Sequence, residues 1–330
     1  MAIQTTRRGI LIGAVALGAS GRSWAQSPRE ITMSLPSRSL VAASPRIADE
    51  LGLFAAHGLK PKFTYMDSAN ASTLALISRS VDVAMSGTAD AVAAQAHGQK
   101  VLIIANTFAG LSGNLVLSKA VADRLGVTPS ARIGERLKAL DGLLIASTSA
   151  TSSFTISYGN SARAAGSNIR FTYMGLPAMV AALETGVVQG IIATAPFWTV
   201  PVVKGTAVLW IAGPKGELPA EFLPASAADL QVMRDYADAN PDVVKAVIAV
   251  IAELRKAIVE RPADVKAAIA RLYPELNAAT LELIYGVDAA AWNAAPLTAA
   301  DVAHEIAYVK LSGGPIEQLA GINPASMLLP

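Results

Sequence analysis

Short apolar runs alternate with helical patterns along the first two thirds of this 330-residue chain. Four runs have the length of buried strands and are bounded by turn residues: 31–35, 62–66, 81–85 and 101–105. Between them, helical spacing predicts helices over 42–56, 69–79 and 89–97, each ending near Gly, Ser or Arg. Strands that alternate with helices indicate an α/β fold with doubly wound sheets.

The same pattern then returns about 108 residues later. Phe-Thr-Tyr-Met at 63–66 is repeated at 171–174, and the apolar run 81–85 has a counterpart at 188–192. The period is too long for a solenoid, whose repeats span about 20–50 residues. It predicts two similar lobes, and ligands favour the cleft that two such lobes create at the ends of their strands.

We expect lobe one to comprise residues 26–108 and 200–330, and lobe two residues 109–199. In this division the strand 208–212 returns the chain to lobe one. After Asn240-Pro241 the pattern is mostly helical and carries no chemical motif. We interpret this tail as scaffold.

The first 25 residues resemble an export signal. Arg7-Arg8 precede a short apolar segment at 9–18, and Ser23-Trp24-Ala25 offers the small residues that a signal peptidase recognises. The stretch around Arg7-Arg8 resembles a twin-arginine signal; an ordinary secretory signal is the alternative. Without cysteine the chain has no site for a lipid anchor or a disulfide. An untethered exported protein is retained only by a second membrane, so we predict a periplasmic monomer.

Composition excludes several partners. Hydrophobic residues make up 52% of the chain and charged residues 16%, yet the apolar runs are too short for a transmembrane helix. The signal holds three of the 27 basic residues and none of the 25 acidic ones, so the remaining chain has a net charge of −1. No basic stripe remains for nucleic acid or an anionic membrane.

Hydroxyl-rich turns at predicted strand ends are the main candidate site. They lie at 37–39, 86–88 and 147–153, each before a predicted helix. Free N–H groups at a helix start, with hydroxyls beside them, bind an anion, although the same residues also serve as simple helix caps. The candidate ligand-binding residues are Ser37, Arg38, Asn70, Ser86, Gly87, Thr88, Phe108, Ser147, Thr148, Thr151, Ser152, Thr194, Phe197 and Trp198.

Arg38 and the aromatic candidates have alternative roles. Arg38 is the one basic residue of these turns and suits a carboxylate or sulfonate, or else is a solvated arginine. Phe108, Phe197 and Trp198 either wall an organic ligand or pack in the core. Asp90 either complements a helix dipole or receives an ammonium group.

Signals for catalysis are weak. The three histidines, His57, His97 and His304, are scattered without metal-ligand spacing. The sequence has no phosphate loop, nucleophile elbow or dinucleotide fingerprint. We therefore predict no enzyme activity, no metal and no cofactor.

Three segments resemble one known family. They are 44–59, where a helix ends in Gly-Leu-Phe followed by Gly-Leu, 80–84 (Ser-Val-Asp-Val-Ala) and 182–190. These segments are similar to the substrate-binding proteins of ABC importers for nitrate, sulfonates, taurine and related molecules. The resemblance covers roughly residues 29–260. It implies a two-lobed type II periplasmic binding fold with two crossover strands, a small organic anion (sulfonate- or carboxylate-like) as ligand, and an ABC permease in the inner membrane as partner.

Two alternatives stay open beside the importer. The family includes relatives that bind pyrimidine precursors of thiamine, and an enzyme on the same fold that forms such a precursor is one alternative. Against it, the cysteine-containing motif of the pyrimidine-forming relatives is missing, and Gln189 replaces the more usual acid of the 182–190 segment. A binding protein that signals to a membrane sensor is the other alternative.

Overall fold

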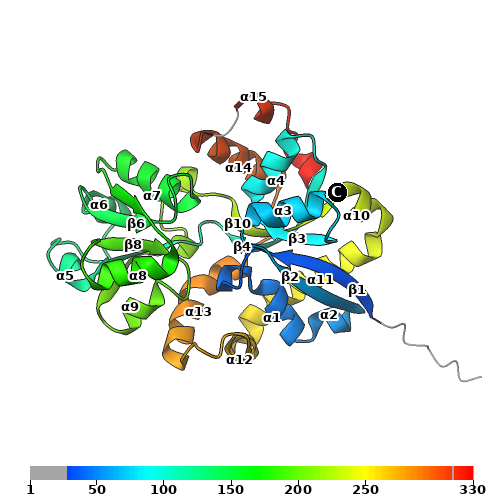
Figure 1. The fold of residues 1–330 in the computed structure, drawn as a ribbon, viewed down its shortest axis with the longest axis horizontal. Coiled ribbons are helices and arrows are strands. Elements are labelled where there is room, and N and C mark those ends of the chain that lie inside the picture. The colour runs from blue at the N-terminus through cyan, green and yellow to red at the C-terminus, as the bar shows by residue number, and fades with distance from the viewer. Residues whose placement is uncertain (1–27, 314–315, 330) are drawn as a thin grey trace, which may run out of the picture.

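The strands of the protein form two separate five-stranded sheets, one in each lobe of a two-lobed molecule (Figure 1). The computed structural model describes residues 28–313 and 316–329. The first sheet has the order β2-β1-β3-β10-β4 and the second the order β7-β6-β8-β5-β9. The predicted α/β fold with two similar doubly wound lobes is confirmed. The predicted export signal, 1–25, lies outside the described residues.

Both sheets combine parallel strands with inserted antiparallel strands. In the first, β1 is parallel to β2 and β3, and β10 is antiparallel to β3 and β4. In the second, β6 is parallel to β7 and β8, and β5 is antiparallel to β8 and β9. The strands of the first sheet are β1 (Arg29–Leu35), β2 (Leu59–Tyr65), β3 (Val83–Ser86), β4 (Val101–Ala109) and β10 (Ser226–Met233). Those of the second are β5 (Asn114–Ser118), β6 (Leu144–Ser147), β7 (Arg170–Tyr173), β8 (Gly190–Ala193) and β9 (Ala207–Ile211).

The sequence repeat marks the same edge strand in both sheets. Phe63 of β2 pairs with Met33 of β1, and its counterpart Phe171 of β7 pairs with Ile145 of β6. The two Phe-Thr-Tyr-Met segments therefore hold equivalent places, each followed by a helix and then by the sheet's next parallel strand.

One predicted strand belongs to the other lobe. The run 208–212 was expected to return the chain to lobe one, but β9 pairs with β5 in the second sheet, with Val208 opposite Leu117. The reason is packing: Trp210 of β9 is fully buried in the core of the second lobe beside Leu115 of β5. The chain re-enters the first sheet only at β10.

Helices cover both faces of each sheet. The predicted helix 42–56 is interrupted, because Gly52 adopts φ 73°, a left-handed conformation that separates α1 from α2. The helices of the first lobe are α1 (Ser44–Glu50), α2 (Leu53–Ala56), α3 (Ala69–Ile77) and α4 (Thr88–Ala96), with a 3₁₀ turn η1 (Leu40–Ala42). Those of the second are α5 (Lys119–Ala122), α6 (Ile133–Lys138), α7 (Ser153–Ala164), α8 (Leu176–Glu184) and α9 (Thr199–Val203).

The C-terminal third is mostly helical, as predicted. Its elements after β10 are α10 (Arg234–Ala239), α11 (Pro241–Glu260), α12 (Pro262–Leu272), α13 (Ala278–Trp292), α14 (Ala299–Leu311), α15 (Ile316–Leu319) and the 3₁₀ turn η4 (Pro324–Met327). Helix α13 packs against both β4 of the first lobe and α9 of the second, so it touches both (Figure 1). Within the ranges that the structure describes, no helix is both long enough and apolar enough to cross a membrane.

The two connections between the lobes pass directly over one another. The chain crosses first at 110–113, between β4 and β5, and again at 212–225, between β9 and β10, where it forms the 3₁₀ turns η2 (Gly213–Lys215) and η3 (Ala220–Phe222). At their contact, a Cβ atom on Gly213 would lie 2.1 Å from the carbonyl oxygen of Gly113 and 2.9 Å from that of Leu111. Only glycine fits there.

We expect Gly213→Ala to destabilise the protein, because its methyl group overlaps backbone atoms that have little freedom to move. Overpacking of this kind lowers the free energy of unfolding by about 1–3 kcal/mol or more. Gly134→Ala is the matched control. A Cβ there would meet nothing within 4 Å, and alanine in α6 should stabilise by up to about 1 kcal/mol. Chemical denaturation of the two variants checks this, and equal stabilities would contradict the crossing geometry.

Candidate functional site

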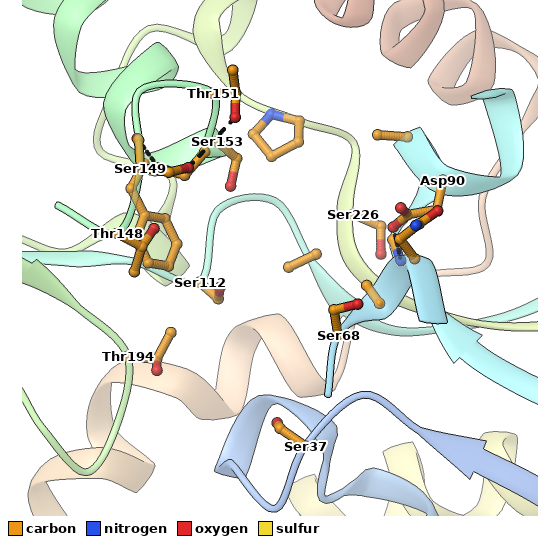
Figure 2. A pocket seen from close by; sticks show the side chains of 18 of the residues that line it. Ser37, Ser68, Asp90, Ser112, Thr148, Ser149, Thr151, Ser153, Thr194 and Ser226 are labelled. Atoms are coloured by element: carbon orange, nitrogen blue, oxygen red, sulfur yellow. Dashed lines mark hydrogen bonds between the residues drawn. The ribbon is translucent and has the colours of Figure 1, made fainter. Parts of the chain in front are cut away.

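A cavity of about 750 Å³ lies between the lobes, where strands end and helices begin. Figure 2 shows hydroxyl groups of the second lobe on one side and Asp90, Ser226, Ser68 and Ser37 on the other. The lining residues from the first lobe and its β10 approach are Ser37, Ser68, Ala69, Asn70, Gly87, Ala89, Asp90, Pro224, Ser226 and Ala227. The rest are Ser112, Thr148, Ser149, Thr151, Ser152, Ser153, Phe154, Leu176 and Thr194 on the second-lobe side, with Glu305 and Tyr308 from α14.

Two helix starts of the first lobe reach the cavity. Ser68 caps α3, and its hydroxyl accepts a hydrogen bond from the Ala71 N–H at 3.1 Å. Helix α4 begins after Gly87, whose N–H donates to the Oδ2 atom of Asp90 at 3.2 Å. Ser86 donates to the same oxygen at 2.9 Å. The carboxylate of Asp90 is therefore held in one orientation at the start of α4.

The start of α7 supplies the opposite wall. Ser152 caps this helix by accepting from the Thr155 N–H at 3.3 Å. Thr155 in turn donates its hydroxyl hydrogen to Ser147 or to the carbonyl oxygen of Ser149, its oxygen lying 2.8 Å and 2.6 Å from them. These bonds fix the turn from behind, while Thr148 and Thr151 remain exposed. The wall thus presents free hydroxyl groups beside the N-terminal end of a twelve-residue helix, the kind of place where anions bind.

Helix α14 adds an acid and a tyrosine. The Oε2 atom of Glu305 accepts a hydrogen bond from the Ala225 N–H at 2.5 Å. Ala225 lies on the second of the two connections between the lobes. The Tyr308 hydroxyl lies 3.0 Å from the Ser157 hydroxyl and 3.3 Å from the Ser153 carbonyl oxygen, both on α7. Because α14 packs against α4, Tyr308 links the two lobes beside the cavity.

Carboxyl groups dominate the electrostatics of this region. The pKa of Glu305 is raised to about 8, chiefly by burial and also by the charges of Asp229 and Asp90, against the hydrogen bond from Ala225. Burial also raises the pKa of Asp90. Asp229, fully buried on β10, has its pKa raised to about 7 by burial, opposed by its hydrogen bond from Thr88. The charged residues among those that line the cavity are acids only.

Half of the predicted residues line this cavity. They are Ser37, Asn70, Gly87, Thr148, Thr151, Ser152 and Thr194. Ser37, Gly87, Thr148, Thr151 and Ser152 lie in the three predicted hydroxyl-rich turns, whereas Asn70 lies at the start of α3 and Thr194 follows β8. The structure therefore brings the predicted turns of both lobes to one space. Whether these residues contact a ligand stays a prediction.

Three predicted hydroxyl residues lie behind the wall instead. Ser86, Thr88 and Ser147 are fully buried and bond to other protein groups. The Thr88 hydroxyl donates to Asp229 at 2.5 Å, and Ser86 lies 2.9 Å from Asp90. Ser86 thereby holds Asp90, and Ser147 lies 3.4 Å from the hydroxyl of Ser152, both of which line the cavity, whereas Thr88 bonds the buried Asp229 behind them.

Arg38 and the three aromatic candidates also lie away from the cavity lining. Arg38 is exposed and stacks its guanidinium over the Tyr65 ring, 3.9 Å from the centroid. Phe108 is fully buried and packs edge-to-face on Trp292, with ring centroids 6.4 Å apart. Trp198 is fully buried and Phe197 packs against the same core cluster. Core packing, the alternative role for the aromatic residues, is what the structure shows.

Sequence reasoning missed several lining residues. Ser149 and Ser153 belong to the turn 147–153, which was singled out, and Asp90 was considered for an ammonium group, so a wider selection would have found them. Ser68 directly precedes the predicted helix 69–79. Phe154 and Tyr308, not the predicted aromatics, supply the rings. Glu305 and Tyr308 carried no signal, because α14 is distant in sequence. The tail is therefore more than scaffold.

Metal binding has no support in the described ranges, 28–313 and 316–329, where no group of three or more His, Cys, Asp or Glu side chains is placed to hold an ion. His57 lies 2.8 Å from Glu253, and the His304 ring nitrogen lies 2.8 Å from the Leu223 carbonyl oxygen. Both histidines serve ordinary structural contacts.

Comparison with known proteins gives a consistent family and fold. The model of the NMT1-like family matches residues 36–273. No curated protein matches the sequence. The periplasmic aliphatic sulphonate binding protein SsuA from Escherichia coli is similar in structure, with a TM-score of 0.65 at 15% identity, over 91% of this chain and 96% of its own.

Two further structures agree. The alkanesulfonate-binding protein SsuA from Xanthomonas axonopodis pv. citri, bound to MOPS, has a TM-score of 0.64 at 17% identity, over 92% of this chain and 99% of its own. A Candida albicans protein with the generic periplasmic binding protein fold has a TM-score of 0.59 at 15% identity, over 91% of this chain and 96% of its own. At these identities the likeness shows the fold.

Because Thr88 is buried and Thr151 is exposed, we expect substitution by alanine to affect protein stability at the first position but not at the second. Thr88→Ala leaves the buried Asp229 carboxyl without its donor, and should lower the free energy of unfolding by about 1–3 kcal/mol. Thr151→Ala removes an exposed hydroxyl and should change it by less than about 0.5 kcal/mol. Urea denaturation without ligand measures both. An unaffected Thr88→Ala variant would contradict the assignment of Thr88 to the buried layer.

Proposed function

The chain belongs to the NMT1-like family, and from this premise we propose that it is the periplasmic solute-binding component of an ABC importer, which binds a small organic anion between two hinged lobes. The single observation that carries the proposal is the cavity between the lobes, lined by the helix starts of both. A family-level solute-binding role agrees with the sulfonate-binding proteins that share the fold.

The anionic end of the ligand is assigned to the α7 side. Thr148, Ser149 and Thr151 are the donors there, together with the N–H groups at the start of α7. Such groups bind a sulfonate or carboxylate without a basic side chain. A cavity of about 750 Å³ falls in the range that organic ligands of moderate size occupy.

Closure of the lobes is the proposed working motion. A ligand that contacts both walls stabilises the closed form, since neither wall alone satisfies it. The closed form is then the one that a permease in the inner membrane recognises. We propose that the protein acts as a monomer, because each copy contains both walls of its own site.

The first test identifies the small molecules that copurify with the protein. Mass spectrometry of small molecules released from the purified protein identifies the ligand, and calorimetry on the stripped protein measures its affinity. Asn70→Ala on lobe one and Thr151→Ala on lobe two should each weaken binding about tenfold to a hundredfold, the effect of losing one hydrogen bond to a charged group.

Two controls decide the outcome of that test. Thr64→Ala, an exposed substitution on β2 away from the cavity, should bind as the unmodified protein does. Recovery of the ligand unchanged after prolonged incubation is expected. A chemically altered product would instead favour a pyrimidine-precursor-forming enzyme. Normal binding by both cavity variants, Asn70→Ala and Thr151→Ala, would contradict the proposed binding site.

Export is the second part of the proposal. The twin arginines Arg7 and Arg8 are assigned to a signal that sends the folded protein to the periplasm. We expect replacement of both by lysine to trap unprocessed precursor inside the cell, detected by immunoblotting of cell fractions. Normal processing of the original sequence in a strain that lacks the twin-arginine translocase would reject this route and leave an ordinary secretory signal.

A further inference from the structure

Of the charged residues that line the cavity, Asp90 lies across from the α7 wall (Figure 2) and Glu305 lies on α14. Asp90 and Glu305 belong to α4 and α14, and both are acidic. Arg38, the basic residue predicted for this site, stacks on Tyr65 instead. A ligand that is an anion throughout would bring negative charge toward these carboxyl groups, which like-charge repulsion opposes.

Glu305 has an oxygen in need of a donor. Its side chain has no exposed surface, and its Oε2 atom is occupied by the Ala225 N–H. Its Oε1 atom has no hydrogen-bond partner among the described residues. A buried oxygen of this kind is unfavourable unless a donor reaches it, and a ligand in the adjoining cavity is placed to provide one.

Hydrogen bonds also fix the orientation of the Asp90 carboxylate. Ser86 and Gly87 both donate to its Oδ2 atom, so the carboxylate cannot swing away without losing them. Behind both acids lies Asp229, whose charge and that of Asp90 raise the pKa of Glu305. Three carboxyl groups thus share one region, and a positive charge placed there would favour their ionised forms.

We propose that the ligand carries a protonated nitrogen, which binds at the end of the cavity lined by Asp90 and Glu305. Together with the anionic end assigned to the α7 wall, this makes the ligand a zwitterionic organic molecule. The inference rests on the proposed solute-binding function. It goes beyond the family likeness, since Glu305 and Tyr308 lie outside the matched residues 36–273.

Neutral Glu305 offers one competing explanation. A protonated glutamic acid donates a hydrogen bond to a ligand oxygen instead of receiving a cation. Glu305→Gln separates the two. Its amide oxygen keeps the bond from Ala225, and its NH₂ group donates much as a protonated acid does, but it attracts no cation.

The experiment measures affinities by calorimetry near pH 7.5 for three matched series of probes. They are ω-aminoalkanesulfonates of increasing chain length, alkanesulfonates of the same lengths without the amine, and the corresponding alkylamines. At the chain length that fits, the aminoalkanesulfonate should bind about tenfold to a hundredfold more tightly than the alkanesulfonate.

The variants should remove this preference. Glu305→Gln and Asp90→Asn should each weaken the aminoalkanesulfonate by about the same factor, while the plain alkanesulfonate binds equally well or better. Glu317→Gln and Asp67→Asn are the matched controls, because both acids are exposed and lie outside the cavity lining. Melting temperatures without ligand show whether each variant is folded. Asp90→Asn answers the question if Glu305→Gln is unstable.

Each result has a distinct meaning. Equal or tighter binding of the plain alkanesulfonate by the unmodified protein overturns the cation site and leaves the proposed anion-binding function intact. Binding of alkylamines together with the zwitterions, but not of alkanesulfonates, supports the cation site and rejects the anionic end. Undiminished zwitterion binding by both variants overturns the inference, as does the absence of binding by every probe, which also counts against the proposed anion.

Discussion

The passage of two chain segments over one another between the lobes is the constraint on which the rest of the structure depends. Each sheet contains an antiparallel strand that follows a crossing: β5 after the first, β10 after the second. The crossings meet where Gly213 lies against the carbonyl of Gly113. Ser112 on the first crossing and Pro224 on the second line the cavity. The contact that joins the lobes therefore also fixes where their facing helix starts converge.

Helix α14 gives this general architecture a particular chemistry. It packs on α4, bonds the second crossing through Glu305 and reaches α7 through Tyr308. One helix thus contacts the first lobe, the connection and the second lobe. Its two cavity residues come from beyond the part of the chain that the family model matches. The matched residues thus hold most of both sheets, whereas Glu305 and Tyr308 lie on a helix that follows the matched segment.

Periodicity predicted the fold well because each strand is a short apolar run with a helix on either side, a pattern that local sequence records. The repeat at 63–66 and 171–174 even located equivalent edge strands. The lobe to which β9 belongs could not be predicted from local sequence, because it depends on the packing of Trp210 in the core of the second lobe. The hydroxyl-rich turns in the sequence indicated much of the cavity wall, but the sequence did not show which side chains of each turn face the cavity. In sequence Thr88 and Ser86 resemble ligand-binding residues, yet both hydroxyls bond carboxyl groups of the protein, Asp229 and Asp90.

The contacts already made without ligand limit what a ligand has to supply. Tyr308 joins α14 to α7, and α13 touches both lobes, so one side of the cleft is connected in the empty protein. If the lobes close as proposed, these contacts would limit the motion to the other side of the cleft, which reduces the conformational entropy lost on closure. A ligand shifts the equilibrium toward closure only by its difference in affinity for the two forms. Under the proposed function, ligand contacts with Glu305 on α14 and with Thr151 on α7 would therefore favour closure only to the extent that the open form lacks them.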